Sequence, residues 1–255
     1  GDSLSFVEGD GGDYSGTEDT NLASSSDWSE RNISNESWIF VDQEDGDYGY
    51  GETSALIRFP DAFGQAEGQV PREAEIVSAM LHLYVSNPGG LIQIFEVLED
   101  WDVDEVTWDS RSDDLGPWES DGAADYPSHA TKVLDEFEGV EGEWVTLSLD
   151  SAVKYWALEP DENFGVLLQA QSTDGTDIPS SESDDSSYRP MLTVVFTLPD
   201  DWKPGEEDTG DGAEDTSSGG DDTGSAEAGG DDGGSVEPDS ADPSGSDEGI
   251  GIDGD

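Results

Sequence analysis

The chain has 255 residues, with 64 Asp and Glu against 8 Lys and Arg, and its formal net charge is −56. A surface of this charge repels phosphate backbones and anionic lipid, so the composition excludes nucleic-acid binding and binding to a membrane surface. Cysteine is absent, which excludes disulfides and thiolate metal sites, and no apolar run is long enough to insert into a membrane.

The first residues also bear on where the protein acts. The chain begins at Gly1 without a basic and then apolar leader, which fits the mature form of an exported protein. Hydrated carboxylates keep a protein soluble where salt screens their repulsion. We therefore expect a secreted or cell-surface protein.

The N-terminal segment combines a short strand with an acidic loop. Residues 4–7 are predicted as the strand, and the Gly- and Asp-rich loop runs to Thr20. Asp10, Asp13 and Asp19 are candidate ligands of a calcium ion, a hard cation that takes six to eight oxygens. The alternative is a solvated loop whose Asp and Gly residues only form turns.

A second acidic segment, residues 42–50, follows the strand predicted at residues 38–41. It resembles an EF-hand loop, but its fifth position is Gly46 and its twelfth is Thr53 in place of the required glutamate. We reject an EF-hand and keep the segment as a weaker cation candidate.

The next predicted strand, residues 53–59, has two apolar faces and one arginine. Ala55, Ile57 and Phe59 share one face, and Leu56 lies on the other face with Arg58. An arginine buried in such an acidic chain needs a carboxylate partner, and Glu182 is one candidate among many.

Two strands in the middle of the chain have the clearest patterns. Residues 76–85 alternate, and the face predicted to be buried consists of Ala79, Leu81, Leu83 and Val85. A turn at residues 87–90 contains Pro and two Gly. Residues 91–98 are apolar on both faces, which is typical of a central strand in a sheet covered on both sides.

The long segment 109–129 is turn-rich and has no strand pattern. Loops of this length in a compact domain are often functional. Its aromatic residues Trp118 and Tyr126 are candidate ligand-binding residues, because aromatic rings stack on the apolar C–H faces of sugars. The alternative is that they plug the end of the sandwich as part of the core.

The C-terminal half of the folded region is predicted to contain one helix among strands. Asp150 is predicted as the N-cap of a helix over residues 151–158, which Pro160 ends. The spacing of Val153, Trp156 and Ala157 predicts its buried face. Strands are predicted on either side of it, over residues 144–149, 163–171 and 188–196.

The composition changes after residue 198. Residues 201–255 hold 19 of the acidic residues and 14 glycines, with only scattered apolar side chains. Such a segment buries too little surface to offset its chain entropy. We predict a folded domain over residues 1–198 and a disordered acidic tail or linker over residues 199–255, which acts as a spacer.

Short motifs occur in a distinctive order across residues 3–198. They are Tyr14, Gly16, Thr17, Asp19 and Thr20 in the opening loop; Leu56 to Phe59; Ser78 to Val85; Phe95 to Val97; Trp101; Val106 to Trp108; Asn163 to Leu168; Ser180 to Glu182; and Arg189 with Pro190. In order and spacing they resemble the DNRLRE family, secreted β-sandwich modules also classed among carbohydrate-binding modules.

Fold and function are expected to follow from the pattern and this resemblance. We expect an all-β, antiparallel, jelly-roll-like β-sandwich with one short helix. No catalytic fingerprint occurs in the sequence, so we expect no enzyme. The resemblance implies a non-catalytic extracellular module that binds a polysaccharide or cell-surface glycan, or mediates adhesion.

The alternative function is a structural subunit or spacer of a surface layer, filament or larger secreted enzyme. Its partner would be a second copy of the chain or a C-terminal neighbour that has been removed. An exposed aromatic row would favour glycan binding, whereas a long unpaired apolar strand edge would favour the structural role.

Overall fold

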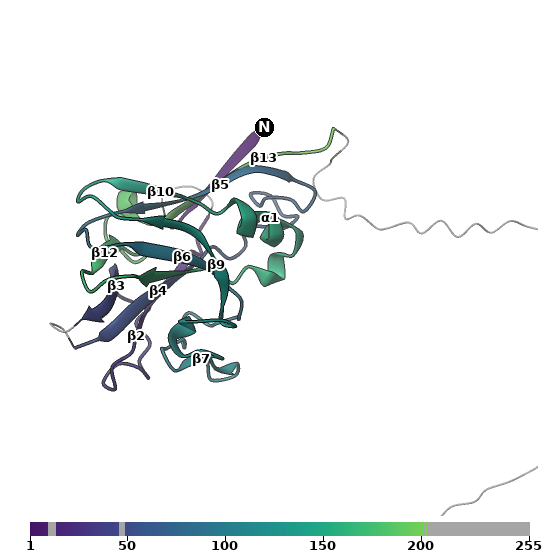
Figure 1. The fold of residues 1–255 in the computed structure, drawn as a ribbon. Helices are drawn as coiled ribbons and strands as arrows, with labels where there is room; N and C mark the ends of the chain where they lie inside the picture. The colour runs from purple at the N-terminus through teal and green to yellow at the C-terminus, as the bar shows by residue number, and fades with distance from the viewer. Residues whose placement is uncertain (10–13, 46–48, 201, 203–255) are drawn as a thin grey trace, which may run out of the picture. The chain divides into compact units, whose positions relative to one another are not determined.

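Two antiparallel sheets packed face to face form the protein in the computed structural model, which describes residues 1–9, 14–45, 49–200 and 202 (Figure 1). The predicted all-β, jelly-roll-like sandwich with one short α-helix is confirmed. All described residues belong to the compact unit Gly1–Asp208. The predicted acidic tail lies almost wholly outside the described residues.

Four strands form the smaller sheet, in the order β1 (Asp2–Val7), β13 (Met191–Thr197), β5 (Glu75–Tyr84) and β10 (Trp144–Ser148). The predicted alternation along β5 is confirmed, because Ala79, Leu81 and Leu83 are fully buried while Met80 and His82 are only half-buried. One face of this sheet therefore builds the core and the other meets solvent.

The larger sheet has the order β12 (Thr176–Pro179), β3 (Trp38–Asp45), β4 (Gly51–Arg58), β11 (Val166–Ala170), β6 (Ile92–Val97) and β9 (His129–Phe137), with β2 (Glu18–Ala23) paired to β4. As predicted, β6 is a central strand that is apolar on both faces. Ile92 and Ile94 join the core between the sheets, whereas Phe95 and Val97 join a second core on the outer face.

The helix α1 (Asp150–Leu158) closes one side of the main core (Figure 1). Its predicted buried face is confirmed, because Val153, Trp156 and Ala157 are buried. The predicted cap is wrong: Asp150 is the first helical residue and its side chain caps no helical N–H. Its carboxylate instead accepts the backbone N–H of Ala79 at 2.7 Å, and so ties the helix to β5.

The second core covers the outer face of the larger sheet. The segment after β6 supplies the cover, including the short ribbon β7 (Ser110–Ser112) and β8 (Gly116–Pro117), on the side away from the smaller sheet (Figure 1). Its buried members are Leu22, Leu56, Phe95, Val97 and Leu167 from the strands, and Trp101, Val106, Trp118 and Ala123 from the cover.

Trp118 is therefore part of the core and not a surface platform. Its side chain is only 4% exposed, and its Nε1 donates to the carbonyl of Thr107 at 3.0 Å. The expectation that Trp118 stacks on a ligand is wrong, because the outer face of an apolar sheet needs large side chains to cover it. The alternative, that this residue plugs the sandwich, holds for Trp118.

Arg58 lies at the edge of this second core and has the carboxylate partners that its burial requires. Its guanidinium donates to Glu18 at 2.6 Å and to Asp100 at 2.8 Å, and lies 4.4 Å from the ring centroid of Trp101. The suggestion that Glu182 is the carboxylate partner of Arg58 is wrong. Arg58 instead joins β4 to the turn that begins the cover.

Replacement of Trp118 tests the cover. We expect Trp118→Ala to lower the free energy of unfolding by about 3–5 kcal/mol, the usual cost of truncating a buried aromatic residue. Trp118→Phe should cost less, since it keeps most of the ring, while Trp144→Ala, at a side chain that is 43% exposed, should cost least. Urea unfolding followed by far-UV circular dichroism measures the order. Equal losses of unfolding free energy in Trp118→Ala and Trp144→Ala would contradict the role of Trp118 as part of the cover.

Candidate functional site

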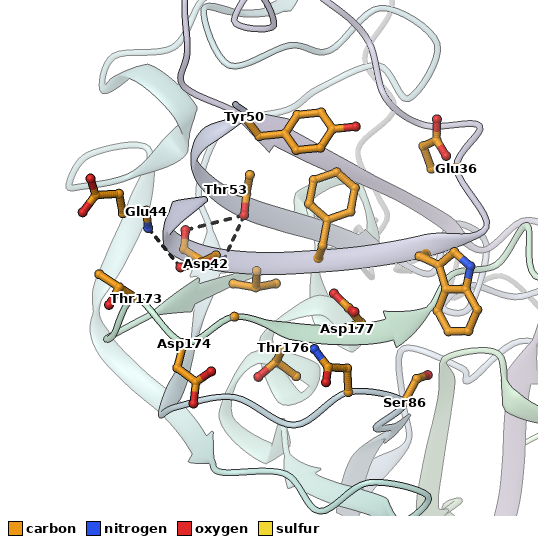
Figure 2. A pocket seen from close by; sticks show the side chains of 15 residues that line it. Glu36, Asp42, Glu44, Tyr50, Thr53, Ser86, Thr173, Asp174, Thr176 and Asp177 are labelled. Carbon is orange, nitrogen blue, oxygen red and sulfur yellow. Dashed lines mark hydrogen bonds between the residues drawn. The ribbon is translucent and has the colours of Figure 1, made fainter. Parts of the chain in front are cut away.

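An open groove of about 920 Å³ lies where β3 and β12 pair at the edge of the larger sheet (Figure 2). Aromatic, acidic and hydroxyl side chains line it together with the turn that precedes β12. The lining residues are Glu36, Trp38, Phe40, Val41, Asp42, Glu44, Tyr50, Thr53, Ser86, Asn87, Thr173, Asp174, Gly175, Thr176 and Asp177.

The alternation of β3 explains why aromatic side chains face the groove. Ile39 and Val41 are fully buried in the main core, so Trp38 and Phe40 must point to the opposite face. Trp38 is accordingly 47% exposed although it belongs to a paired strand.

The register of β12 sets a carboxylate beside these rings. Asp177 is directly opposite Phe40, and Pro179 is opposite Trp38. Residues opposite each other in an antiparallel pair have their side chains on the same face of the sheet. A ring and a carboxylate are therefore adjacent on the groove face, whereas Ile178 is buried in the core behind them.

A buried amide holds β3 in this position. The side chain of Asn21, on β2, donates to the carbonyl of Trp38 at 2.9 Å and accepts the N–H of Phe40 at 2.8 Å. It thus takes the place of a neighbouring strand for the backbone on both sides of Ile39. The backbones of Trp38 and Phe40 are therefore fixed, while their rings point to the face of the sheet that lines the groove.

The floor of the groove is held from its other side by the turn after β5. The backbone of Asp177 exchanges hydrogen bonds with Asn87, at 2.9 and 3.3 Å, and its carbonyl accepts the N–H of Ser86. Gly89 approaches the backbone of Asp174 so closely that a Cβ there would lie 2.2 Å from its carbonyl oxygen. A glycine is therefore required at this contact.

The aromatic surface continues from Phe40 onto the neighbouring segment. The ring of Tyr50 lies 4.9 Å from that of Phe40 and 4.6 Å from that of Trp28, centroid to centroid. The guanidinium of Arg31 covers Trp28 at 4.8 Å. Stacked rings of this kind hold one another in place, so the wall of the groove loses little side-chain entropy when a ligand binds.

All charged side chains that line the groove are acidic. The lining includes five carboxylates, from Glu36, Asp42, Glu44, Asp174 and Asp177, and none of the described lining residues is Lys, Arg or His. The hydroxyls of Ser86 and Thr176 have no hydrogen-bond partner among the described residues. These two hydroxyl oxygens are buried, so the groove offers its carboxylate oxygens as acceptors beside apolar ring faces.

The residues expected from the sequence to bind a ligand lie elsewhere. Tyr126 is 63% exposed, as a stacking residue must be, but it is not among the residues that line the groove. Trp118 is buried in the second core. The sequence predicts the strand at residues 38–41 but not the groove beside it. The aromatic side chains of Trp38 and Phe40, on the face of this strand away from the core, are the signal that indicates it.

The candidate calcium ligands have different outcomes. Asp10 and Asp13 lie outside the described residues, so calcium binding by this loop stays a prediction. Asp19 is 2% exposed on β2, and its carboxylate accepts the backbone N–H of Ser181 at 2.7 Å. Among the described residues, no group of three or more His, Asp or Glu side chains is arranged to hold a metal ion.

Burial dominates the chemistry of Asp19. It raises the pKa of this carboxyl to about 7, although the hydrogen bonds from Ser181 and the nearby Arg189 act in the opposite direction. A carboxyl in this state serves as a hydrogen-bond acceptor that ties β2 to the loop before β13. Ligation of calcium by Asp19 stays a prediction, but its carboxylate is buried and already bonded to the backbone of Ser181.

Comparison with known proteins gives no family for the chain. No protein-family model matches it, and no curated protein matches its sequence. The resemblance to the DNRLRE family stays a prediction that rests on the order of the motifs. None of the helices in the described part of the chain is long and apolar enough to cross a membrane.

The buried carboxyl of Asp19 predicts a pH-dependent stability. Its pKa is about 7 in the folded state and near 3.8 when unfolded, so between these values the folded state holds a proton that the unfolded state has lost. Stability therefore falls as the pH rises through this window. Asp19→Asn keeps an acceptor without the charge, so its Tm relative to wild type should be several °C higher at about pH 8 than at about pH 5.

Differential scanning calorimetry at the two pH values measures this difference. Asp27→Asn, at an exposed aspartate, is the matched control and should change Tm equally at both. A pH-independent effect of Asp19→Asn would show that the carboxyl is ionised throughout.

Proposed function

We propose that the protein is a non-catalytic, extracellular module that binds a polysaccharide or cell-surface glycan in the groove at β3 and β12. The observation that carries this proposal is the pairing of Phe40 with Asp177 on two strands whose backbones are fixed. A sugar ring has an apolar C–H face and a rim of hydroxyls. The ring of Phe40 suits the face, and the carboxylate accepts hydrogen bonds from the rim.

The charge of the groove narrows the class of glycan. Five carboxylates line it without a described basic residue, so a uronate or sulfate group would meet like charges on every side. Neutral sugars and amine-bearing sugars avoid this repulsion, and an ammonium group is attracted. The proposed ligand is therefore a neutral or amine-bearing glycan.

The exposed aromatic row also favours glycan binding over a role as structural subunit or spacer. Trp38, Phe40 and Tyr50 are all only partly buried and all line the same groove. A spacer has no need of rings held at an open surface, whereas a glycan site requires them.

Binding to an array of polysaccharides tests the proposal. Neutral and amine-bearing members, such as glucans, N-acetylglucosamine polymers and glucosamine polymers, should include the ligand, and uronate and sulfated members should not bind. Phe40→Ala should weaken binding of that ligand roughly three- to ten-fold, the loss expected for one aromatic stacking contact. Isothermal titration calorimetry with a soluble oligosaccharide measures the change.

Two further variants locate the site. Tyr155→Ala removes a ring that is 47% exposed on α1, outside the groove, and should leave the affinity unchanged. Tyr126→Ala tests the position expected from the sequence. If Tyr126→Ala abolishes binding and Phe40→Ala does not, the groove is not the site. Failure of every neutral and amine-bearing glycan to bind overturns the proposed function.

A further inference from the structure

A second groove, of about 460 Å³, adjoins the first at the rim between the two sheets. Aromatic and acidic side chains line it, and none of its described lining residues is Lys, Arg or His. These lining residues are Ser37, Trp38, Tyr84, Ser86, Glu141, Gly142, Pro179, Ser183, Asp184, Asp185 and Tyr188.

The two grooves share Trp38 and Ser86, which line both. The chain itself joins them, because Tyr84 ends β5 in the second groove and Asn87 lines the first. Trp38 therefore stands between two hollows, and its 47% exposure leaves surface for contact with a ligand.

The second groove has an aromatic cluster of its own. The rings of Tyr84 and Tyr188 lie 4.2 Å apart, centroid to centroid, and Trp144 meets Tyr84 edge-on at 5.6 Å. Tyr188 is 36% exposed and Trp144 is 43% exposed. Tyr84 and Tyr188 line the second groove, and Trp144, which is not among its lining residues, supports Tyr84 from the side. The two tyrosine rings provide a stacking surface like that of the first groove.

The wall that carries Tyr188 is fixed from behind. Arg189 donates to the carbonyl of Ser183 at 2.9 Å and to that of Glu8 at 2.9 Å, which ties this loop to the end of β1. Asp185 accepts the N–H of Ser187 at 3.1 Å and so caps the single turn that presents Tyr188. The second groove is thus built on fixed backbone, as the first is.

We propose that the two grooves are adjoining subsites for one extended polysaccharide chain, which passes over Trp38 from the rim of the larger sheet to the rim of the smaller one. The inference rests on the proposed function and adds to it that the ligand is a polymer rather than a short saccharide. Both grooves combine exposed rings with carboxylates, so the sugars in each must belong to the same neutral or amine-bearing class.

A ladder of oligosaccharides tests the second subsite. The probes are soluble oligomers, from disaccharide to hexasaccharide, of whichever neutral or amine-bearing polymer binds on the array, titrated calorimetrically into the full chain. Affinity should rise at least ten-fold along the ladder, because a longer chain gains a second set of ring contacts without a second association cost.

Single-ring variants assign the gain to the grooves. Tyr188→Ala should weaken the hexasaccharide roughly three- to ten-fold and leave the shortest bound oligomer unchanged, whereas Phe40→Ala should weaken both. Trp38→Ala, at the wall that both grooves share, should weaken binding of the hexasaccharide more than Tyr188→Ala or Phe40→Ala does. Tyr84→Ala, on β5 in the second groove, repeats the Tyr188 measurement if that variant does not fold, which its melting curve reveals.

The outcomes separate this inference from the proposed function. Binding that is sensitive to Phe40→Ala but no tighter for the hexasaccharide, and insensitive to Tyr188→Ala and Tyr84→Ala, overturns the second subsite and leaves the first. A length-dependent gain that Tyr188→Ala removes supports it. Absence of binding at every length overturns the proposed function, and the inference with it.

Discussion

Burial of the larger sheet on both of its faces is the constraint on which the rest of the structure depends. Its inner face packs on the smaller sheet and α1, and its outer face is covered by the segment that contains Trp101 and Trp118. Each face is apolar, so exposure of either would be costly. Neither face of the central strands of the larger sheet is left to hold a ligand, and the rim at β3 and β12 is where rings of this sheet reach solvent.

Coverage of two faces requires long connections, and these are held by buried polar side chains bonded to backbone. The indole of Trp101 donates to the carbonyl of Phe164, and the amide of Asn163 donates to that of Phe59. Asn21 and Asp19 tie β2 to β3 and to the loop before β13. Each bond satisfies a carbonyl or N–H that has no partner in a sheet, so the loss of any of these side chains would leave a backbone group without its hydrogen bond.

The sequence predicted those parts of the fold whose pattern is local. The alternation of β5, the two apolar faces of β6 and the spacing of α1 are visible within ten residues, because apolar burial repeats with the period of the element. The prediction of a loop up to Thr20 is wrong for β2, since its buried side chains include Asp19, Thr20 and Asn21, whose partners are far away in the chain. Most of β9 is only partly buried and β12 has four residues, so neither has a clear pattern.

The outward rings of β3 follow from its alternation, but the carboxylate beside them could not be predicted from the sequence. It comes from the pairing of β12 with β3, which brings Asp177 beside Phe40 across 136 intervening residues, and no local pattern encodes that register. The motif residues that carry the family resemblance, such as Tyr14, Arg58 and Arg189, make fold contacts to Pro60, Glu18 and Glu8.

The residues that line the first groove lie outside those motifs. Under the proposed function, ligand choice can therefore change through Trp38, Phe40 and the turn before β12 while the contacts that hold the sandwich stay the same. The residues that hold the fold differ from those proposed to contact the ligand, so the motifs bear on the sandwich alone, and the proposed ligand is selected by the rings and charges at its rim.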